Sequence, residues 1–332
     1  MSESHLPAPP RFRIASTGVL LAALGAIAFS GKAVIVKLAY RYGVDAVTLI
    51  ALRMVFAFPF FAATAWWMST RQSTQPLSSA DRVRIVVLGF LGYYLASFLD
   101  FLGLQYITAT LERLILYLNP TLVLLLGAVF LGRPATGRQL CALVISYAGV
   151  ALALGHDFRL GGSNILMGSA LVFASALAYA LYLVGSGQLV QRVGSIRLTA
   201  YASCIACACC IAQFLLTRPL SGLLDLPAPV YWLSLLNGIA STVLPVFAVM
   251  MAVARIGASA AAQVGMIGPV STIVLSSVFL GEEMGRWQIG GTLLVILGVF
   301  IVSQRSRKGE QHDANHASHQ NPRQRRPGSS PA

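Results

Sequence analysis

The chain is built from apolar runs of about 20 residues, separated by short polar stretches, and a helix of this length spans a bilayer. Hydrophobic residues make up 56% of the chain and charged residues only 11%. A soluble domain carries about 25% charged residues, so the sequence predicts an all-α polytopic membrane protein. The predicted transmembrane helices are 17–40, 46–68, 83–104, 107–131, 138–155, 165–187, 198–217, 229–253, 257–280 and 286–304.

An internal repeat divides these ten helices into two halves. A shift of 149 residues maps 106–150 onto 255–299 without a gap. It places Pro120 on Pro269, Val129-Phe130-Leu131-Gly132 on Val278-Phe279-Leu280-Gly281, and Gly149-Val150 on Gly298-Val299. Each half has an odd number of helices, so the halves insert in opposite orientations and form an inverted five-plus-five repeat. The predicted parts are a tail 1–16, a first unit 17–155, a second unit 165–304, and a disordered basic tail 305–332.

The arginines of the predicted loops indicate the orientation of the chain. With both termini in the cytoplasm, the inner loops hold Arg71, Arg82, Arg84, Arg133, Arg138, Arg192, Arg197 and Arg255, and the outer loops hold Arg41, Arg159, Arg218 and Arg286. Basic residues favour the cytoplasmic side, so we expect cytoplasmic termini and, for a protein of this class, a location in the inner membrane. The net charge of +13 comes mainly from tails and short loops, which argues against nucleic acid as a partner.

Six ionisable residues lie inside predicted helices, and all belong to the first unit: Lys32, Lys37, Arg53, Asp100, Glu112 and Arg113. A charge at this depth costs at least about 2.5 kcal/mol, so each needs a partner, water or a function. Counted from the outer loops, all six fall in the outer half of the bilayer, where they can meet. The repeat places Val249 opposite Asp100 and Ala261 opposite Glu112, so the scaffold itself does not require these charges.

Three interpretations of this set stay open. The charges can be buried ion pairs, Asp100 with Arg113 and Glu112 with Arg53 or Lys32. Alternatively, two cations remain after pairing and attract an anionic or carboxylate-bearing substrate. A proton can also be relayed through Asp100 or Glu112. Lys37 lies near a helix end, where its ammonium group can reach the interface.

Other residues complete the predicted site. Tyr117 lies four residues after Arg113, and Asn119 seven after Glu112, so each pair shares a helix face. With the charged residues other than Lys37, they form the predicted substrate site. Pro120 and Pro269 occupy matching positions, and mid-helix prolines bend helices, so we expect kinks that line a shared central cavity. We interpret Cys204-x-x-Cys207 as packing inside a helix and predict neither a metal nor a cofactor.

With these features the sequence resembles the EamA-type transporters of the drug/metabolite transporter superfamily, over about 17–155 and 165–304. The resemblance rests on the paired prolines, the two Phe-Leu-Gly motifs with Glu282 after the second, and the paired Gly-Val motifs, together with Lys37 and Arg53. It implies ten helices around a central cavity that moves metabolites by alternating access. Two departures are Arg133, where the family commonly has glutamate, and the set Lys32, Glu112 and Arg113, which indicates a subgroup with its own substrate.

We therefore predict a secondary transporter that exports small organic metabolites, anionic or carboxylate-bearing, with the proton as a candidate coupling ion. The alternative substrate is a cationic drug-like compound, recognised by Glu112 and Asp100 and coupled to protons. A membrane sensor or scaffold that uses its basic tail on anionic lipid is the alternative of another class. An enzyme is not expected, since all five histidines lie in tails or loops and no Walker-type glycine-rich loop is present.

Overall fold

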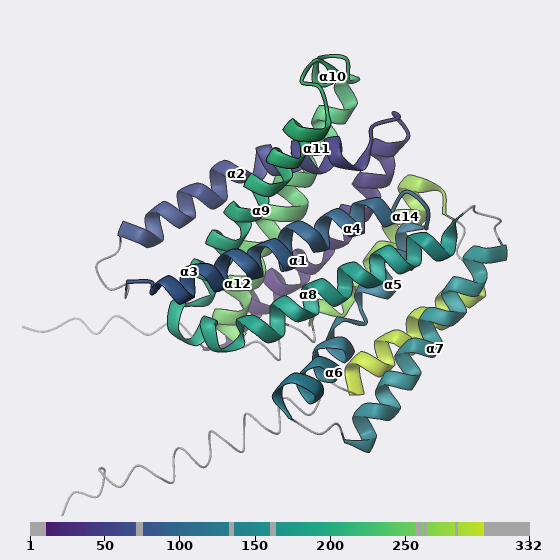
Figure 1. Ribbon diagram of the computed structural model, residues 1–332. Coiled ribbons are helices and arrows are strands. Elements are labelled where there is room, and N and C mark those ends of the chain that lie inside the picture. Colours follow the sequence, from purple (N-terminus) through teal and green to yellow (C-terminus); the bar gives the residue numbers. More distant parts are fainter. Residues whose placement is uncertain are drawn as a thin grey trace, which may run out of the picture.

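The computed structural model is a bundle of helices that cross one another at varied angles (Figure 1). It describes residues 11–70, 76–132, 136–159, 164–256, 261, 264–282 and 285–301. The predicted tail 305–332, residues 1–10 of the predicted N-terminal tail, and Arg133 lie outside the described residues. No strand occurs in the described part of the chain, as the composition predicts.

The first unit contains α1 (Arg11–Tyr40), α2 (Ala46–Thr70), α3 (Ser79–Gly89), η1 (Phe90–Leu95), α4 (Ala96–Gly103), α5 (Ala109–Leu116), α6 (Asn119–Leu131) and α7 (Gly137–Arg159). The second contains α8 (Ile165–Val193), α9 (Ser195–Thr217), α10 (Ser221–Leu224), α11 (Ala228–Gly238), η2 (Ile239–Val243), α12 (Leu244–Ile256), α14 (Ile267–Leu280) and a C-terminal helix, Arg286–Ile301. The elements η1 and η2 are short π-helices that join α3 to α4 and α11 to α12.

Over the described ranges, eight helical segments are long and apolar enough to cross a bilayer, and each coincides with one of the first eight predicted transmembrane helices. The last two, α14 and the C-terminal helix, are shorter apolar helices, so the count of ten stays a prediction. Helix α1 begins at Arg11, six residues before its predicted start. Apolarity marks where a helix enters the bilayer, whereas Arg, Ile and Ala also extend a helix into water.

The packing of the helices follows the repeat. Helix α1, the first of its unit, packs against α12 and α14, and α8, the first of the second unit, packs in the same way against α4 and α6. Helices α2 and α9, the second of each unit, pack against each other. The two units are therefore interleaved rather than folded as separate domains.

Glycines bring α7 against the C-terminal helix, which is its counterpart in the second unit. A methyl group on Gly149 would meet the carbonyl oxygen of Gly291, and one on Gly298 would meet the Ser146 hydroxyl. Along α7 the contacts run from 146 to 149, while along the partner they run from 298 back to 291. These equivalent helices are therefore antiparallel, which is the relation that an inverted repeat requires.

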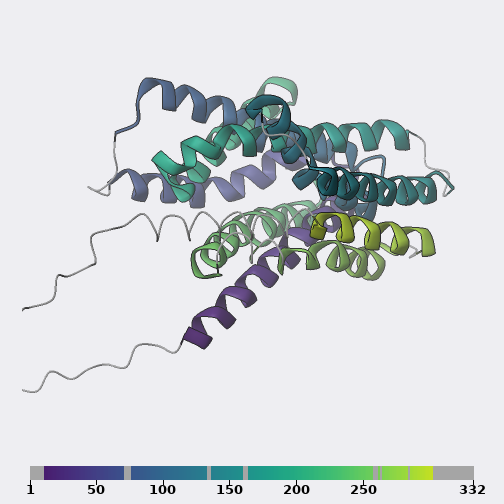
Figure 2. The same cartoon turned by 90° about the horizontal axis from the view of Figure 1, so that it is seen from below.

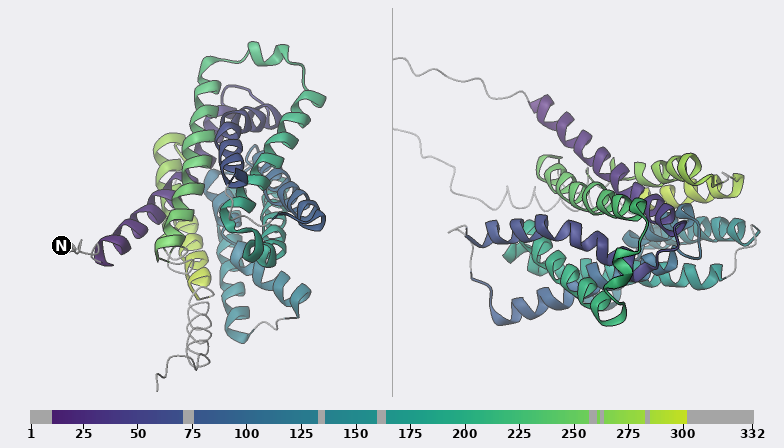
Figure 3. Two further views of the ribbon diagram at one scale, coloured as in Figure 1. Left: turned by 90° about the vertical axis from the view of Figure 1, so that its left-hand side faces the viewer. Right: turned by 90° about the horizontal axis from the view of Figure 1, so that it is seen from above.

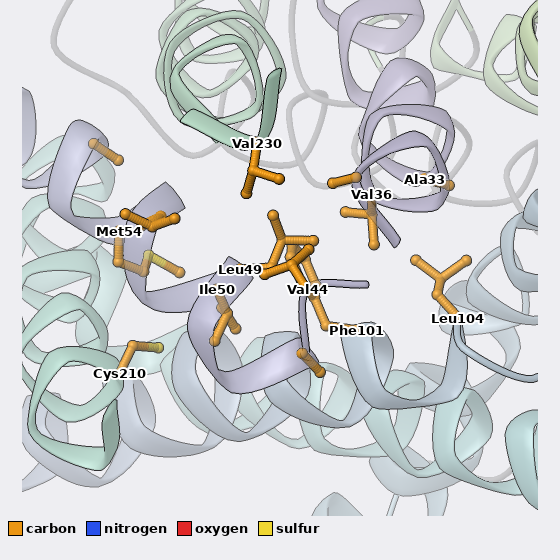
Figure 4. Packing of buried hydrophobic residues seen from close by; sticks show 14 of the residues in the cluster. Ala33, Val36, Val44, Leu49, Ile50, Met54, Phe101, Leu104, Cys210 and Val230 are labelled. Atoms are coloured by element: carbon orange, nitrogen blue, oxygen red, sulfur yellow. The ribbon is translucent and has the colours of Figure 1, made fainter. Parts of the chain in front are cut away.

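One end of the bundle, around the α1–α2 turn, is tightly packed. Figure 4 shows Val36, Leu49, Phe101 and Val230 meeting there from four different helices, with Leu104 just after α4, and all are buried. In α2 the buried residues all lie between Ala46 and Phe61, in its first two thirds. At the opposite end the N-terminal part of α1 stays in contact with α12, where Gly18 faces Ile256, and Figures 2 and 3 show these two helices lying apart from α2 and α3. The bundle is thus closed around the α1–α2 turn and spread apart at the other end.

Candidate functional site

A cavity of about 370 Å³ lies between the helices of the two units. Its wall includes residues of α1, α2, α4, α5 and α6 from the first unit and of α8, α9 and α12 from the second, together with both π-helices. Six of the seven predicted substrate residues line it: Lys32, Arg53, Asp100, Arg113, Tyr117 and Asn119. The seventh, Glu112, lies behind the wall and is completely buried.

Lys32 holds both buried carboxylates. Its Nζ atom donates a hydrogen bond to Oδ2 of Asp100 and lies 2.9 Å from Oε1 of Glu112. The exposed fractions of the three side chains are 11%, 4% and 0%. Of the ion pairs considered from the sequence, only the one between Lys32 and Glu112 is formed in this structure. The position of α1 determines this pairing, because α1 packs against α5 and brings the Lys32 ammonium group between the two acids.

Arg53 is held by neutral groups. Its Nε atom donates to Oγ1 of Thr242, 2.8 Å away, and its guanidinium lies 5.1 Å from the centre of the Phe101 ring. Its Nη1 atom is buried without a hydrogen-bond partner in the described part of the chain. The guanidinium therefore keeps an unused donor beside the cavity.

Arg113 is placed in a similar way. Its Nη2 atom donates to Oγ of Ser30 at 3.3 Å, and its guanidinium lies 5.4 Å from the centre of the Tyr117 ring. Its Nε atom has no partner within the described ranges. Among the described residues neither Arg113 nor Arg53 forms an ion pair. Lys32 thus pairs with both acids, and within the described ranges neither arginine has an acidic partner of its own.

A break in the fourth predicted transmembrane helix positions the polar groups beside Arg113. Helix α5 ends at Leu116 and α6 begins at Asn119. Tyr117 donates its hydroxyl proton to the Gly265 carbonyl oxygen, 2.5 Å away. Asn119 donates to the Leu116 carbonyl at 3.0 Å, while its Oδ1 atom is buried without a partner among the described residues.

The two repeated prolines differ from the expectation of mid-helix kinks that line the cavity. Pro120 occupies the first turn of α6 and is exposed, and Pro269 is the third residue of α14 and is buried. Proline is tolerated in a first turn because the N–H there has no partner within the helix. Neither proline is among the cavity-lining residues. They mark where a helix restarts, and the residues just before Pro120 face the cavity.

The π-helices η1 and η2 were not predicted from the sequence. A shift of 149 residues carries Phe90, the first residue of η1, onto Ile239, the first of η2. Both contribute to the cavity, η1 through Gly92 and Tyr93 and η2 through Thr242. In η2, the side-chain hydroxyl of Thr242 donates to the carbonyl of Asn237, five residues earlier, at 2.8 Å. The one available signal was Pro245, which follows η2 and cannot donate a backbone hydrogen bond.

The remaining predicted features lie elsewhere. Lys37 is at the closed end, where its ammonium group donates to the Ile107 carbonyl at 2.9 Å. Cys207 is a buried free thiol, 3.7 Å from the sulfur of Met54. Within the described ranges, no group of three or more His, Cys, Asp or Glu residues is arranged to hold a metal ion.

Comparison with known proteins agrees with the repeat. The sequence model of the EamA-like transporter family matches residues 16–155 and 166–304. The uncharacterized transporter YcbK of Bacillus subtilis (strain 168) is 30% identical over 314 residues, which cover 90% of this chain and 98% of that protein. An uncharacterized transporter of Archaeoglobus fulgidus is 24% identical over 87% of this chain and 98% of its own.

A solved crystal structure has the same fold. It superimposes with a TM-score of 0.61 at 19% sequence identity and covers 89% of this chain and 99% of its own. The family match, the named relatives and the apolar helices together show a multi-pass membrane transporter rather than an enzyme. The chain belongs to the EamA-like transporter family, within the drug/metabolite transporter superfamily.

Proposed function

We propose that the protein is a secondary transporter that exports small organic anions, in particular carboxylates, across the inner membrane. The observation that carries this proposal is the pair Arg53 and Arg113, two cations beside one interior cavity that have no ion pair in the described part of the chain. The site has three basic groups and two acidic ones, which leaves one positive charge unbalanced, and a guanidinium binds a carboxylate through two parallel hydrogen bonds. A bound carboxylate would supply the missing charge.

Alternating access is the mechanism that fits this bundle. The helices are packed tightly around the α1–α2 turn and spread apart at the other end, so the cavity would open at only one end at a time. Rocking of α1, α12 and α14 against α4, α6 and α8 would exchange the open and closed ends. With ten transmembrane helices and cytoplasmic termini, the closed end lies outside and this conformation receives substrate from the cytoplasm.

We place the coupling proton on the carboxylates of Asp100 and Glu112. The cluster with Lys32 contains two acids and one ammonium group, and Arg53 and Arg113 are the other charged groups of the site. A proton on one acid would neutralise the cluster, and binding of an anion nearby would favour that proton. A Glu112→Gln variant should therefore still exchange substrate but lose transport driven by a pH gradient.

A cationic substrate has less support. Asp100 faces the cavity, but Lys32 is already bound to it, and Glu112 is buried behind the wall. A cation would have to displace the lysine before it met a free carboxylate. The arginines, by contrast, have no ion pair within the described ranges that an anion would have to break.

The test is a thermal-shift screen of the purified protein against organic acids, amino acids, phosphorylated acids and cationic dyes. We expect a carboxylate to stabilise the wild type. Arg53→Ala or Arg113→Ala should weaken its binding by about 10- to 100-fold, the value of a charged hydrogen bond. Arg255→Ala, which removes the same charge from an exposed position of α12, is the matched control. Stabilisation by cations alone, or an equal loss in the control, would contradict the proposal.

A separate experiment distinguishes a transporter from a membrane scaffold that depends on the basic tail. Deletion of 305–332 removes the basic tail but leaves every cavity residue in place. Transport into everted vesicles should persist after the deletion, and it should run in the export direction. Loss of transport in a correctly folded truncated protein would favour the tail-dependent scaffold.

A further inference from the structure

Three tyrosines form a compact cluster in another part of the cavity wall. Tyr93 comes from η1, and Tyr179 and Tyr182 come from α8. The ring centres of Tyr93 and Tyr182 are 5.1 Å apart, those of Tyr179 and Tyr182 are 5.7 Å apart, and those of Tyr93 and Tyr179 are 6.5 Å apart. Tyr93 and Tyr179 line the cavity, whereas Tyr182 is buried behind them.

The backbone of η1 fixes this cluster. The Tyr182 ring packs directly on Gly92, where even a methyl group would overlap it. The hydroxyl oxygens of Tyr93 and Tyr182 are 3.5 Å apart and share a hydrogen bond. One turn further, the Ser175 hydroxyl of α8 donates to the Ala96 carbonyl at 2.7 Å. The rings are thus held in place before any ligand arrives, which lowers the entropic cost of binding.

The rest of the lining is also suited to a ring. Phe29 and Phe61 border the same cavity, and a volume of about 370 Å³ lies near the lower limit for small-molecule sites. Aromatic rings attract one another edge to face or offset, beyond what burial of the same area supplies. The charged groups come from α1, α2, α4 and α5, whereas Tyr93 comes from η1 and Tyr179 from α8.

We propose that Tyr93 and Tyr179 form a subsite for a flat aromatic ring, so that the substrate is an aromatic carboxylate. Tyr182 is a positioning residue that acts through Tyr93. This inference rests on the proposed function, since it assumes that Arg53 and Arg113 bind the carboxylate. The subsite specifies the part of the substrate other than its carboxylate, which is an aromatic ring, and the side chains that select this ring.

Matched pairs of acids test the subsite in the purified full-length protein. Benzoate is compared with cyclohexanecarboxylate, and 2-naphthoate with its saturated decalin analogue, so that the carboxylate is kept while the aromatic ring is lost. We expect the aromatic acid to bind about 3- to 10-fold more tightly in each pair. Tyr179→Leu and Tyr93→Leu should each reduce this preference to below about twofold, while binding of the saturated acid stays nearly constant.

The controls separate the ring from its hydroxyl and from general destabilisation. Tyr93→Phe keeps the ring and should keep the preference. Tyr147→Leu removes a partly buried tyrosine that does not line the cavity, and should leave both affinities unchanged. Gly92→Ala displaces the Tyr182 ring and should reduce the aromatic preference alone. Melting curves without ligand establish that each variant is folded.

The outcomes also separate this inference from the proposed function. Equal binding of both members of each pair to the wild type, with Arg113→Ala weakening both, would overturn the aromatic subsite and leave anion transport standing. If none of these acids bound, while other carboxylates bound in an Arg113-dependent way, the subsite would again be overturned. If no carboxylate of any kind bound, both proposals would fail.

Discussion

Glu282 caps a helix of the other repeat, because its Oε1 atom accepts a hydrogen bond of 2.8 Å from the backbone N–H of Ala109, the first residue of α5. Its Oε2 atom accepts from the Thr110 hydroxyl at 3.1 Å. A carboxylate at a helix N-terminus satisfies unpaired N–H groups and interacts favourably with the helix dipole. The glutamate after the second Phe-Leu-Gly motif therefore fastens α14 to α5 at the closed end of the bundle.

Glu282→Gln should weaken this cap. We expect the free energy of unfolding to fall by about 0.5–2 kcal/mol, with faster amide hydrogen exchange at the start of α5. Urea unfolding and hydrogen exchange measure the two effects. Asp225→Asn removes an exposed acid from the loop after α10 and should change neither. Unaltered exchange in Glu282→Gln would show that the hydrogen bonds contribute nothing to this end.

Lys32→Met should be strongly destabilising, because it leaves two buried carboxylates without a cation. Breaking a buried ion pair on one side costs about 3–5 kcal/mol. The triple variant with Asp100→Asn and Glu112→Gln removes all three charges and should recover most of that loss. Equilibrium unfolding of the single, double and triple variants measures the coupling. If the losses were simply additive, the three residues would not act as one cluster.

Gly291→Ala should disturb the crossing of α7 with the C-terminal helix. A methyl group there would come within 2.5 Å of the Gly149 carbonyl oxygen, and backbone cannot yield as a flexible side chain can. We expect a loss of about 1–3 kcal/mol in unfolding free energy. Gly290→Ala, one residue earlier, meets nothing within 4 Å and is the matched control. Equal stability of the two variants would contradict the close crossing.

Asp45 makes stability depend on pH in a definite direction. Partial burial alone would raise the pKa of its carboxyl, but hydrogen bonds from Thr48 and Arg218 outweigh burial and lower the pKa below its usual value. The ionised Asp45 carboxylate therefore contributes to the free energy of unfolding. This contribution is fully present above the unfolded pKa of about 3.9 and is lost as the pH falls through the lowered pKa of the folded protein. Because the pair with Arg218 is exposed, we expect less than about 1 kcal/mol.

Unfolding of the wild type and of Asp45→Asn between pH 7 and pH 3 measures the contribution of Asp45 to stability. The difference between the two proteins should be constant near neutral pH and should shrink at the acid end. A difference that grew toward low pH would contradict the assigned direction.

The sequence alone determined the class, the transmembrane helices and the repeat, because these depend on local composition and on similarity within the chain. Eight apolar runs became eight helices of matching position, since a backbone in hydrocarbon must satisfy its own hydrogen bonds. The residues around the cavity could also be named, because charges are rare inside a membrane and each one needs a reason to be there.

The pairing of those charges was decided only by the tertiary structure. Spacing along one helix could not tell that Lys32 would reach both Asp100 and Glu112, since the contact depends on how α1 lies against helices distant in sequence. Likewise, Thr242 became the partner of Arg53 only when the two repeats interleaved, and Ser30 became the partner of Arg113 only when α1 packed against α5. The π-helices and the tyrosine cluster also depend on the tertiary structure. Long-range packing selects one among several local geometries that the surrounding sequence permits.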